Sequence, residues 1–337
     1  MTAEQGPSKS ELPSKTERLK PGCKLLLPSP DFLAAFAYAN KENKRVVSTM
    51  KPNEKTLYAL FEEYDAIYSL LAQLVRKENI FVTKTKFLIG KNGGDILFTE
   101  EVRLPQKLLD KYRPIGAHFL TSDQYKCYPR DAHTFVDGKI LANKNAWSIS
   151  EDIVRSGLGE GGRVLTRGKV IFITRDINRN FKDETARLRQ SGFRIGVLPF
   201  VDPREQKHDF KEDHIDGHAT LIEGQSGKLS LIVADSYSRQ GNHTRRMIRE
   251  ACEFVGVKMV EVDDSNLPPL ALNLIQFEDR SIAMTNSEAY DLELTLVNML
   301  GRDKVFTTDV PLVKIPHLTC AGIRCLTNII PPLPFIK

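Results

Sequence analysis

The sequence lacks long hydrophobic runs. Its 337 residues contain no stretch of about 18 consecutive apolar residues, the minimum that a membrane-spanning helix requires. The first 20 residues also lack an apolar core, so we expect neither a secretory signal nor a membrane partner. With 41% hydrophobic and 27% charged residues, the chain has the composition of a soluble globular protein with a large core.

The cysteine content and the net charge are also low. An odd, scattered set of cysteines argues against a disulfide framework and favours free thiols in a reducing compartment, so we expect a cytoplasmic protein. The net charge of +5 comes from well-mixed acidic and basic residues, which is too mild and too dispersed to indicate a nucleic-acid partner. Trp147, the single tryptophan, is interpreted as a packing residue. The five cysteines are Cys23, Cys127, Cys252, Cys320 and Cys325.

The N-terminus differs in composition from the rest of the chain. Residues 1–20 are rich in Ser, Pro, Lys and Glu, which is typical of a disordered tail. Because no linker-like segment interrupts the sequence after that point, we expect residues 21–337 to form a single domain. Whether the chain associates with copies of itself stays open at this stage.

A unit of strand, turn, strand, helix and strand recurs along the chain. The clearest copy has a hairpin at 163–173, a helix at 182–190 and a strand at 195–200. Repeats of roughly 50 residues that carry both hairpins and helices favour a closed ring of α/β units over a doubly wound sheet. The other predicted segments are a strand at 24–28, a helix at 53–77, strands at 79–89 and through 98, hairpins at 134–141, 218–233 and 272–284, helices at 244–254 and 289–300, and strands at 257–262 and 305–308.

Chemically active side chains stand just before, or at the start of, successive repeats. Equivalent positions in a ring of repeats converge on its axis, so we expect these side chains to share one pocket. Cys325, which follows a glycine turn and precedes the apolar run 326–330, is expected to begin the first strand of the last repeat. In chain order, the set is Asp131, Glu160, His214 with Asp216, Asn273 and Cys325.

This set of side chains suits one kind of substrate. Carboxylates grouped around a pocket repel one another unless the ligand is a cation, and a planar guanidinium matches them best because its N–H groups bind carboxylates bidentately. A cysteine is a suitable nucleophile for a guanidinium carbon, since its thiolate would be stabilised by the bound cation. A histidine can carry protons near neutral pH.

Four short motifs extend this reasoning to a family. Pro129-Arg130-Asp131, Glu160-Gly161-Gly162, His214-Ile215-Asp216 and Gly322-Ile323-Arg324-Cys325-Leu326-Thr327 occur in this order. In order and spacing they resemble the guanidino-group-modifying superfamily: arginine deiminases, agmatine deiminases, dimethylarginine dimethylaminohydrolases and amidinotransferases. The resemblance runs from about residue 80 to the C-terminus. It implies a five-bladed α/β propeller (pentein) of ββαβ repeats.

The resemblance also implies an activity and site roles. The activity is that of a cysteine-dependent hydrolase of arginine or another guanidino compound, which works through a covalent amidino-cysteine and needs no metal or cofactor. It makes Cys325 the nucleophile and His214 the general acid and base, while Glu160 orients His214 or a substrate nitrogen. It makes Asp131, Asp216 and Arg130 the residues that bind the substrate.

Two positions depart from the family pattern. Many deiminases carry an acid directly after the Glu-Gly-Gly motif, where this chain has Arg163. Arginine-specific members often hold the substrate carboxylate with an arginine shortly upstream of the cysteine, where this chain has Thr319 and Cys320; only Arg324 is near. The guanidino end of the substrate is therefore better defined by the sequence than its other end.

Other interpretations remain. An amidinotransferase shares the covalent intermediate and passes the amidino group to an amine instead of water. The superfamily also has a non-enzymatic propeller relative among ribosome-associated translation factors, but the intact set of acids, His and Cys argues against that class. His214, Asp216 and His218 could form a metal site if they alternate along an extended segment. The loop 157–162 is glycine-rich, but it precedes a strand rather than a helix, so phosphate binding lacks its usual physical basis.

Overall fold

The computed structural model of the protein describes residues 17–28, 33, 54–83, 85–89, 96–100, 133–136, 139–143, 153–156, 161–174, 182–201, 214–286, 290–319 and 321–330. Trp147 and the cysteines Cys127 and Cys320 lie outside these residues. No helix within the described ranges combines the length and the apolarity that crossing a bilayer requires.

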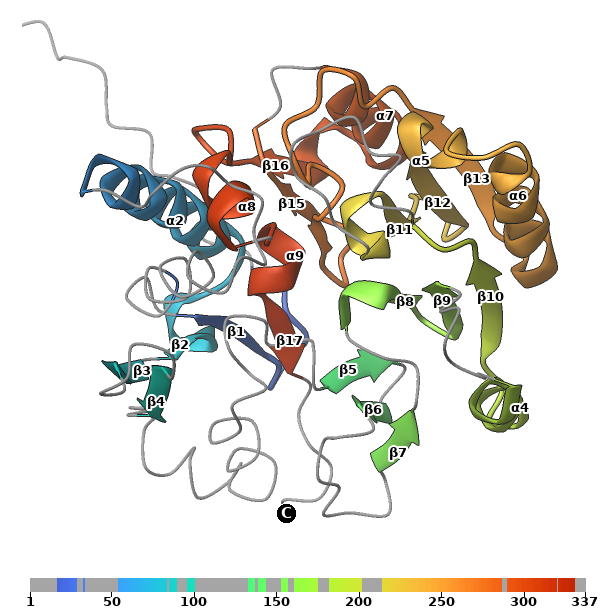
Figure 1. Cartoon of the computed structure of the whole chain (residues 1–337), viewed down its shortest axis with the longest axis horizontal. Helices are drawn as coiled ribbons and strands as arrows, with labels where there is room; N and C mark the ends of the chain where they lie inside the picture. The colour runs from blue at the N-terminus through green and yellow to red at the C-terminus, as the bar shows by residue number, and fades with distance from the viewer. Residues whose placement is uncertain are drawn as a thin grey trace, which may run out of the picture.

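Five three-stranded sheets in the described residues share one topology. In each, the first strand is antiparallel to the second, and the second is parallel to the third. In Figure 1 the sheets lie around a common centre. In the order first, second and third strand they are β5 (His133–Val136), β6 (Lys139–Asn143) and β7 (Ile153–Ser156); β8 (Val164–Arg167), β9 (Val170–Thr174) and β10 (Arg194–Leu198); β11 (Ala219–Glu223), β12 (Leu229–Ala234) and β13 (Lys258–Val262); β14 (Ile275–Gln276), β15 (Ile282–Met284) and β16 (Val305–Thr307); and β17 (Asn328–Ile330), β1 (Lys24–Pro28) and β2 (Ile80–Thr83).

A helix connects the second and third strands in four of these sheets, as parallel neighbours require. The predicted recurrence of strand, turn, strand, helix and strand is therefore confirmed there, and Figure 1 shows the helices on the outside. For β6 and β7 the connecting residues lie outside the described part of the chain. The connecting helices are α2 (Glu54–Leu74), α4 (Lys182–Gln190), α6 (Thr244–Val255) and α7 (Tyr290–Leu300).

The remaining elements are short. A hairpin of β3 (Thr85–Ile89) and β4 (Ile96–Glu100) forms a separate two-stranded sheet. Three 3₁₀ turns, η1 (Lys77–Asn79), η3 (Gly161–Arg163) and η5 (Ile215–Gly217), precede first or third strands, and η6 (Arg302–Lys304) precedes β16. The described residues also include three short helices, α5 (Asp235–Ser238), α8 (Lys314–Thr319) and α9 (Ile323–Leu326).

The two ends of the described chain meet in one sheet. Strand β1 pairs antiparallel with β17, with Leu25 opposite Ile329, and parallel with β2, with Leu25 opposite Ile80. Leu25 and Leu27 are fully buried, so the N-terminal strand lies in the core rather than on an open edge. The C-terminal residues that follow Cys325 are thus held by a strand from the other end of the sequence.

Burial follows the hydrophobic pattern of each element. All five residues of β9 are buried, as expected for a short continuous apolar run at the centre of a sheet. In α6, Ile248, Cys252 and Val255 recur at helical spacing and are buried. Burial raises the pKa of the Cys252 thiol to about 12, so Cys252 is a packing residue rather than a reactive thiol.

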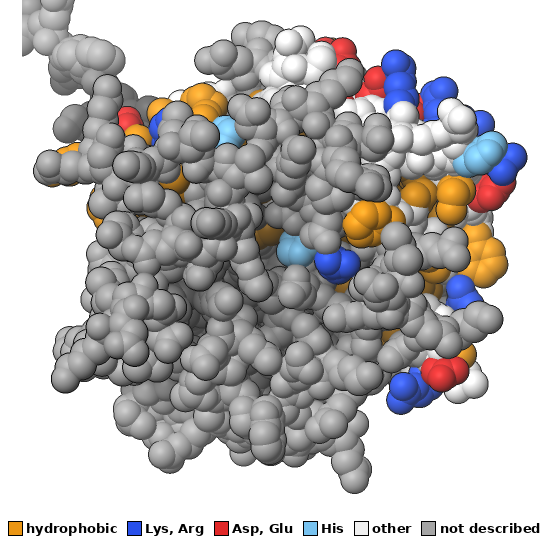
Figure 2. All heavy atoms as spheres, viewed as in Figure 1, with side chains coloured by type: hydrophobic (Ala, Val, Ile, Leu, Met, Phe, Trp, Pro, Cys, Tyr) orange, Lys and Arg blue, Asp and Glu red, His pale blue; other side chains and the backbone are white. Residues whose placement is uncertain are grey.

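The opposite face of α6 is solvated. The side chains of Arg245, Arg246, Arg249 and Glu250 are exposed, and Arg246 pairs with Glu250 at 3.6 Å. Figure 2 shows basic and acidic side chains interspersed over this part of the surface. The interpretation of these arginines as a solvated helix face is confirmed.

The structure differs from the sequence prediction at two boundaries. Strand β14 covers only Ile275–Gln276, not residues 272–277, because Leu270 adopts a positive φ of 58° and the chain turns just before the strand. Residues 17–20 were assigned to the tail, but Leu19 is 5% exposed and Glu17 accepts a hydrogen bond from the Asn79 side chain at 2.7 Å. The packed part of the chain therefore includes Glu17.

Candidate active site

Cys325 lies in the one-turn helix α9, not at the start of a strand as the sequence predicted. Strand β17 begins three residues later, at Asn328. The turn is closed by the backbone N–H of Leu326, which donates to the carbonyl of Gly322 at 3.1 Å. The apolar run 326–330 is typical of a strand and gives no sign of this turn. Cys325 is 8% exposed, so its sulfur lies almost entirely within the protein.

Asn273 fixes the position of the cysteine. Its Oδ1 accepts a hydrogen bond from the backbone N–H of Cys325 at 2.9 Å, and its Nδ2 donates to the sulfur of Cys325 at 3.0 Å. Its backbone carbonyl accepts from the N–H of Arg324 at 3.1 Å. Because a backbone N–H can only donate, the first contact fixes the amide so that its NH₂ group faces the sulfur.

Asp216 is the second side chain in contact with the sulfur. It belongs to η5 and is 2% exposed. The Cys325 thiol donates to Asp216 Oδ2 at 3.4 Å, and Asn273 Nδ2 donates to the backbone carbonyl of Asp216 at 3.3 Å. The structure therefore brings together three of the residues that the sequence placed at equivalent repeat positions: Asp216, Asn273 and Cys325.

His214 stands at the start of η5 and packs against η3. It is the N-cap residue of η5 and is half-buried. A Cβ atom added to Gly162 would lie 2.2 Å from Nδ1 of His214, so the glycine of the Glu-Gly-Gly motif leaves the space that the imidazole fills. Arg163, where many deiminases have an acid, is the last residue of η3.

A second glycine makes room for Asn273. A Cβ atom on Gly322 would lie 2.6 Å from Cβ of Asn273, a distance that real Cβ contacts essentially never show. The φ of Gly322 is −109°, which any residue adopts. The requirement for glycine is therefore steric: it allows the backbone that leads into α9 to approach Asn273.

Three predicted site residues lie outside the described part of the chain. They are Arg130, Asp131 and Glu160. Their motif neighbours are partly described: Gly161 and Gly162 form the start of η3 and are buried, and β5 begins at His133. Their roles remain predictions.

The metal interpretation of His214, Asp216 and His218 required an extended segment. The three residues flank or lie within the 3₁₀ turn η5, so they do not alternate along a strand. His218 instead lies against the ring of Tyr237, with centroids 6.1 Å apart. Across the described ranges, no group of three His, Cys, Asp or Glu side chains comes together as a metal site.

Arg324, the arginine nearest the cysteine, is buried beneath the site. Its side chain is 7% exposed and its Nη1 lies 3.8 Å from Asp216 Oδ2, while its Nη2 donates to the carbonyl of Val164 at 2.8 Å. Its guanidinium therefore supports Asp216 from behind rather than facing solvent. The sequence did not anticipate this role, nor the role of Asn273, whose only signal was its place at the start of the fourth predicted hairpin.

The sequence matches no family model, and it matches no curated protein. The fold, in contrast, matches solved structures. SxtG, an amidinotransferase from Microseira wollei in the saxitoxin biosynthetic pathway, aligns over 93% of this chain and 96% of its own, with 10% identity and a TM-score of 0.50. A Cys-to-Ala variant of AgrE in complex with L-arginine aligns over 93% of this chain and 41% of its own, with 11% identity and a TM-score of 0.50. A Cys-to-Ser variant of DDAH from Pseudomonas aeruginosa, complexed with citrulline, aligns over 91% of this chain and 98% of its own, with 11% identity and a TM-score of 0.48.

These matches concern the fold. The chain has the α/β pentein fold of SxtG, and it spans less than half of the length of AgrE. The α/β fold that the four short motifs implied is therefore confirmed.

Proposed function

We propose that this protein is a cytoplasmic, cysteine-dependent enzyme that hydrolyses a guanidino compound such as arginine or a derivative of it, without a metal or a cofactor. One observation carries the proposal: the buried thiol of Cys325 lies between the amide of Asn273 and the carboxylate of Asp216. A carboxylate beside a nucleophilic sulfur suits a planar cation whose carbon the sulfur attacks. That SxtG is an amidinotransferase and that AgrE binds L-arginine support the same substrate class.

The proposal includes the architecture that assembles the site. The five sheets with one topology support a five-bladed α/β propeller, which the pairing of β1 with β17 would close. In a closed ring the starts of the first strands face one axis. Asp131 and Arg130, just before β5, and Glu160, just before η3, would then face the same pocket as Cys325.

Binding of the substrate would change the partner of Asp216. In the free enzyme the thiol of Cys325 donates to this carboxylate. A guanidinium would take over the carboxylate as its own acceptor, together with Asp131, and its charge would stabilise the thiolate that forms. The N–H donor of Asn273 would stabilise the same thiolate from the other side.

The reaction then proceeds through two displacements. The Cys325 thiol gives its proton to His214, and the thiolate attacks the guanidinium carbon. His214 passes the proton to the departing nitrogen, whose bond to the carbon breaks to release ammonia or an alkylamine. The product of this half-reaction is an amidino group that is bonded to the sulfur of Cys325 and still carries the rest of the substrate on its nitrogen. His214 next takes a proton from water, the hydroxide attacks the amidino carbon, and the thiolate leaves. The released product is a ureido compound, and Glu160 orients His214 or a substrate nitrogen throughout.

The test of this proposal is turnover without an acceptor. The protein is incubated with a panel containing arginine, methylated arginines, agmatine and other guanidines, and ureido products are sought by mass spectrometry. We expect a ureido product from at least one guanidine and none from Cys325→Ala. Turnover that begins only when glycine or another amine is added, with the amidino group appearing on that amine, would replace the hydrolase by an amidinotransferase.

A trapping experiment tests the covalent step. Acid quenching during turnover should leave, on the peptide that contains Cys325, a mass increase equal to the substrate minus the departing amine. Near-normal turnover by Cys325→Ser, or activity that requires an added metal, would refute this mechanism. A lack of turnover with and without acceptors would instead favour the non-enzymatic binding class.

A further inference from the structure

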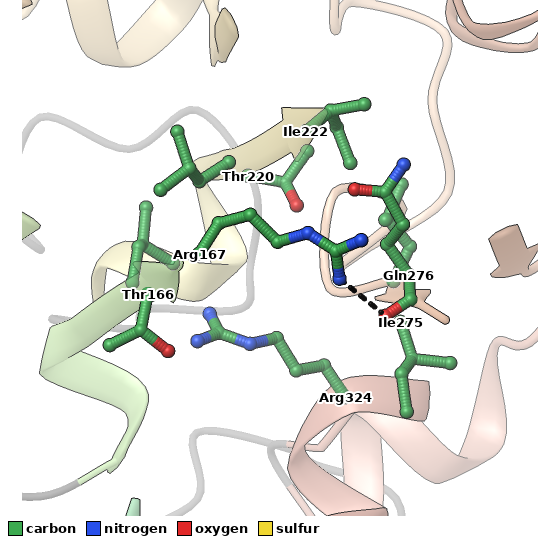
Figure 3. Close-up of a pocket in the computed structure, with 10 residues that line it drawn as sticks. Thr166, Arg167, Thr220, Ile222, Ile275, Gln276 and Arg324 are labelled. Carbon is green, nitrogen blue, oxygen red and sulfur yellow. Dashed lines mark hydrogen bonds between the residues drawn. The ribbon is translucent and has the colours of Figure 1, made fainter. Parts of the chain in front are cut away.

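A small polar cavity is connected to the candidate active site through Arg324, which lines it. It has a volume of about 50 Å³ and is bounded by β8, β11 and β14 and by the side chain of Arg324. Figure 3 shows the side chains of Arg167 and Arg324 running past each other in opposite directions, with the Arg324 guanidinium near Thr166 and the Arg167 guanidinium near Gln276. The hydroxyl-bearing side chains of Thr166 and Thr220 also line it. The cavity thus combines two cations with two neutral hydrogen-bond donors.

Arg324 brings an incompletely satisfied charge to this cavity. Its Nη2 has a hydrogen bond to the carbonyl of Val164, but its buried Nη1 has no hydrogen-bond partner among the described residues. The nearest acid, Asp216, is 3.8 Å from Nη1 and also accepts the thiol of Cys325. A buried guanidinium N–H without a partner is costly, so the site favours an acceptor at that position.

Arg167 adds positive charge without an acid of its own. Its Nε pairs with Glu223 at 3.2 Å, but Glu223 also pairs with Arg280 at 3.0 Å. The Arg167 Nη1 and Nη2 donate only to the backbone carbonyls of Gln276 and Phe277, at 3.3 and 2.9 Å. Two arginines therefore share one carboxylate on this side of the cavity, which leaves an excess of one positive charge.

We propose that this cavity is a binding site for a single monoatomic anion, of which chloride is the physiological example. A water molecule needs about 10–15 Å³ of such volume, so the space suits one small ion with a few water-sized neighbours. The ion accepts hydrogen bonds from Arg324 Nη1 and from the Thr166 and Thr220 hydroxyl groups. It also balances the positive charge that Glu223 leaves uncompensated.

Bromide, which replaces chloride and scatters anomalously, gives a direct test. Crystals of the intact protein grown in sodium bromide should show an anomalous peak in the cavity, within contact distance of Arg324 Nη1. Peaks only at exposed side chains would mean an adventitious ion only and would overturn the proposal. A cavity that contains only water in bromide would overturn it as well.

The thermal transition gives a second test that needs no crystals. At constant ionic strength, replacement of gluconate by chloride should raise the melting temperature in a saturable way, by about 2 °C for an ion that binds only the folded state. Arg324→Met should abolish this chloride shift, while Arg246→Met, on the exposed face of α6, should keep it. If Arg324→Met fails to fold, Thr220→Val should reduce the shift. A shift in the wild-type protein that never saturates would contradict a specific site.

Neither test depends on turnover. A protein without guanidino-modifying activity could still show the bromide peak and the chloride shift, and an active enzyme could lack both. The anion site and the proposed enzymatic function can therefore fail independently.

Discussion

Asn273 contacts Cys325 at two points, its Oδ1 accepting the backbone N–H at 2.9 Å and its Nδ2 donating to the sulfur at 3.0 Å. The two residues are 52 positions apart in sequence, yet one amide fixes both the backbone and the side chain of the proposed nucleophile. The donor contact favours a thiolate, and the acceptor contact prevents the amide from turning away. Asn273 is therefore a positioning residue for Cys325.

Asn273→Asp should separate these two contacts. The carboxylate keeps an acceptor for the Cys325 N–H but places a negative oxygen beside the sulfur instead of an N–H donor. We expect kcat/KM to fall by about 10²–10³-fold, the range for loss of one preorganised donor, with the far-ultraviolet spectrum unchanged. The activity should recover partly at lower pH, where the new carboxyl is protonated and can donate.

A matched control for this substitution lies outside the site. Asn286→Asp makes the same chemical change at a half-buried Asn whose side chain makes only a long, solvent-exposed contact, 3.4 Å, with the carbonyl of Asp309. It should leave kcat/KM within about twofold of the wild type, as surface substitutions usually have small effects. Equal losses in both variants would show that the effect at Asn273 is a general one on the fold.

Gly162→Ala should displace His214. The added Cβ would lie 2.2 Å from the imidazole Nδ1, so the ring or η3 must move. Because general acid–base catalysis contributes about 10²–10⁴-fold, we expect kcat to fall by at least about tenfold and the pH–rate profile to change shape. The measurement is the pH dependence of kcat on the best substrate of the guanidine panel.

Gly224→Ala is the control for that variant. The nearest atom to its added Cβ is the Met299 carbonyl oxygen at 3.5 Å, an ordinary van der Waals contact. This alanine should leave the pH–rate profile unchanged. An unchanged profile in Gly162→Ala as well would remove His214 from the proposed acid and base role.

The sequence predicted the repeats well because their signals are local. Helix α4 occupies the predicted residues 182–190, and β1 the predicted 24–28. The prediction for Cys325 was wrong because its turn depends on a distant residue: the carbonyl and the side chain of Asn273 bind the backbone of Arg324 and Cys325. A run of apolar residues cannot reveal a contact made across 52 positions.

The site was predictable to the extent that repeat position determined it. Asp216 and Cys325 come together as the ring argument required, since equivalent places in repeats meet at one axis. The burial of Arg324 was not predictable, because its partners Val164 and Asp216 belong to two other repeats. Charged residues in a motif were interpreted as ligand-binding candidates. Arg324 belongs to such a motif, but its side chain is buried against other repeats and does not face a ligand.

Glu63 should stabilise the segment that carries Cys325. It is 6% exposed, and its carboxylate accepts from the backbone N–H groups of Val313, Lys314 and Ile315 at 3.0, 2.7 and 2.8 Å. It therefore caps the N-terminus of α8. We expect Glu63→Ala to lower the free energy of unfolding by about 2–3 kcal/mol, because hydrogen bonds to a charged group are lost and buried donors are left unpaired.

Urea denaturation measures this change, and the neighbouring residue provides the control. Glu62 is exposed on the same helix, so Glu62→Ala removes a carboxylate of equal size without removing a cap. It should change the free energy of unfolding by less than about 0.5 kcal/mol. If the two variants are equally stable, the contacts of Glu63 with α8 make no net contribution to the free energy of unfolding.

Asp279 should make the attachment of the N-terminal segment depend on pH. Partial burial by itself raises the pKa of Asp279, but hydrogen bonds from Arg18, Ser281 and Lys304 outweigh this effect and lower the pKa to about 2. The unfolded value is about 3.9. A depressed folded pKa stabilises the protein above the unfolded pKa, and this stabilisation is lost as the pH falls toward the folded pKa.

The test compares the wild type with Asp279→Asn in urea at a series of pH values. Since the Asp279 side chain is 29% exposed, we expect a difference in the free energy of unfolding of about 1–2 kcal/mol, reduced by solvent screening. The difference should be constant above about pH 5, shrink between about pH 4 and 2, and vanish below. Asp309→Asn, at an exposed position, should show no such dependence. A gap between the wild type and Asp279→Asn that persists at pH 2 would mean that the asparagine disturbs packing rather than removing the ion pair with Arg18.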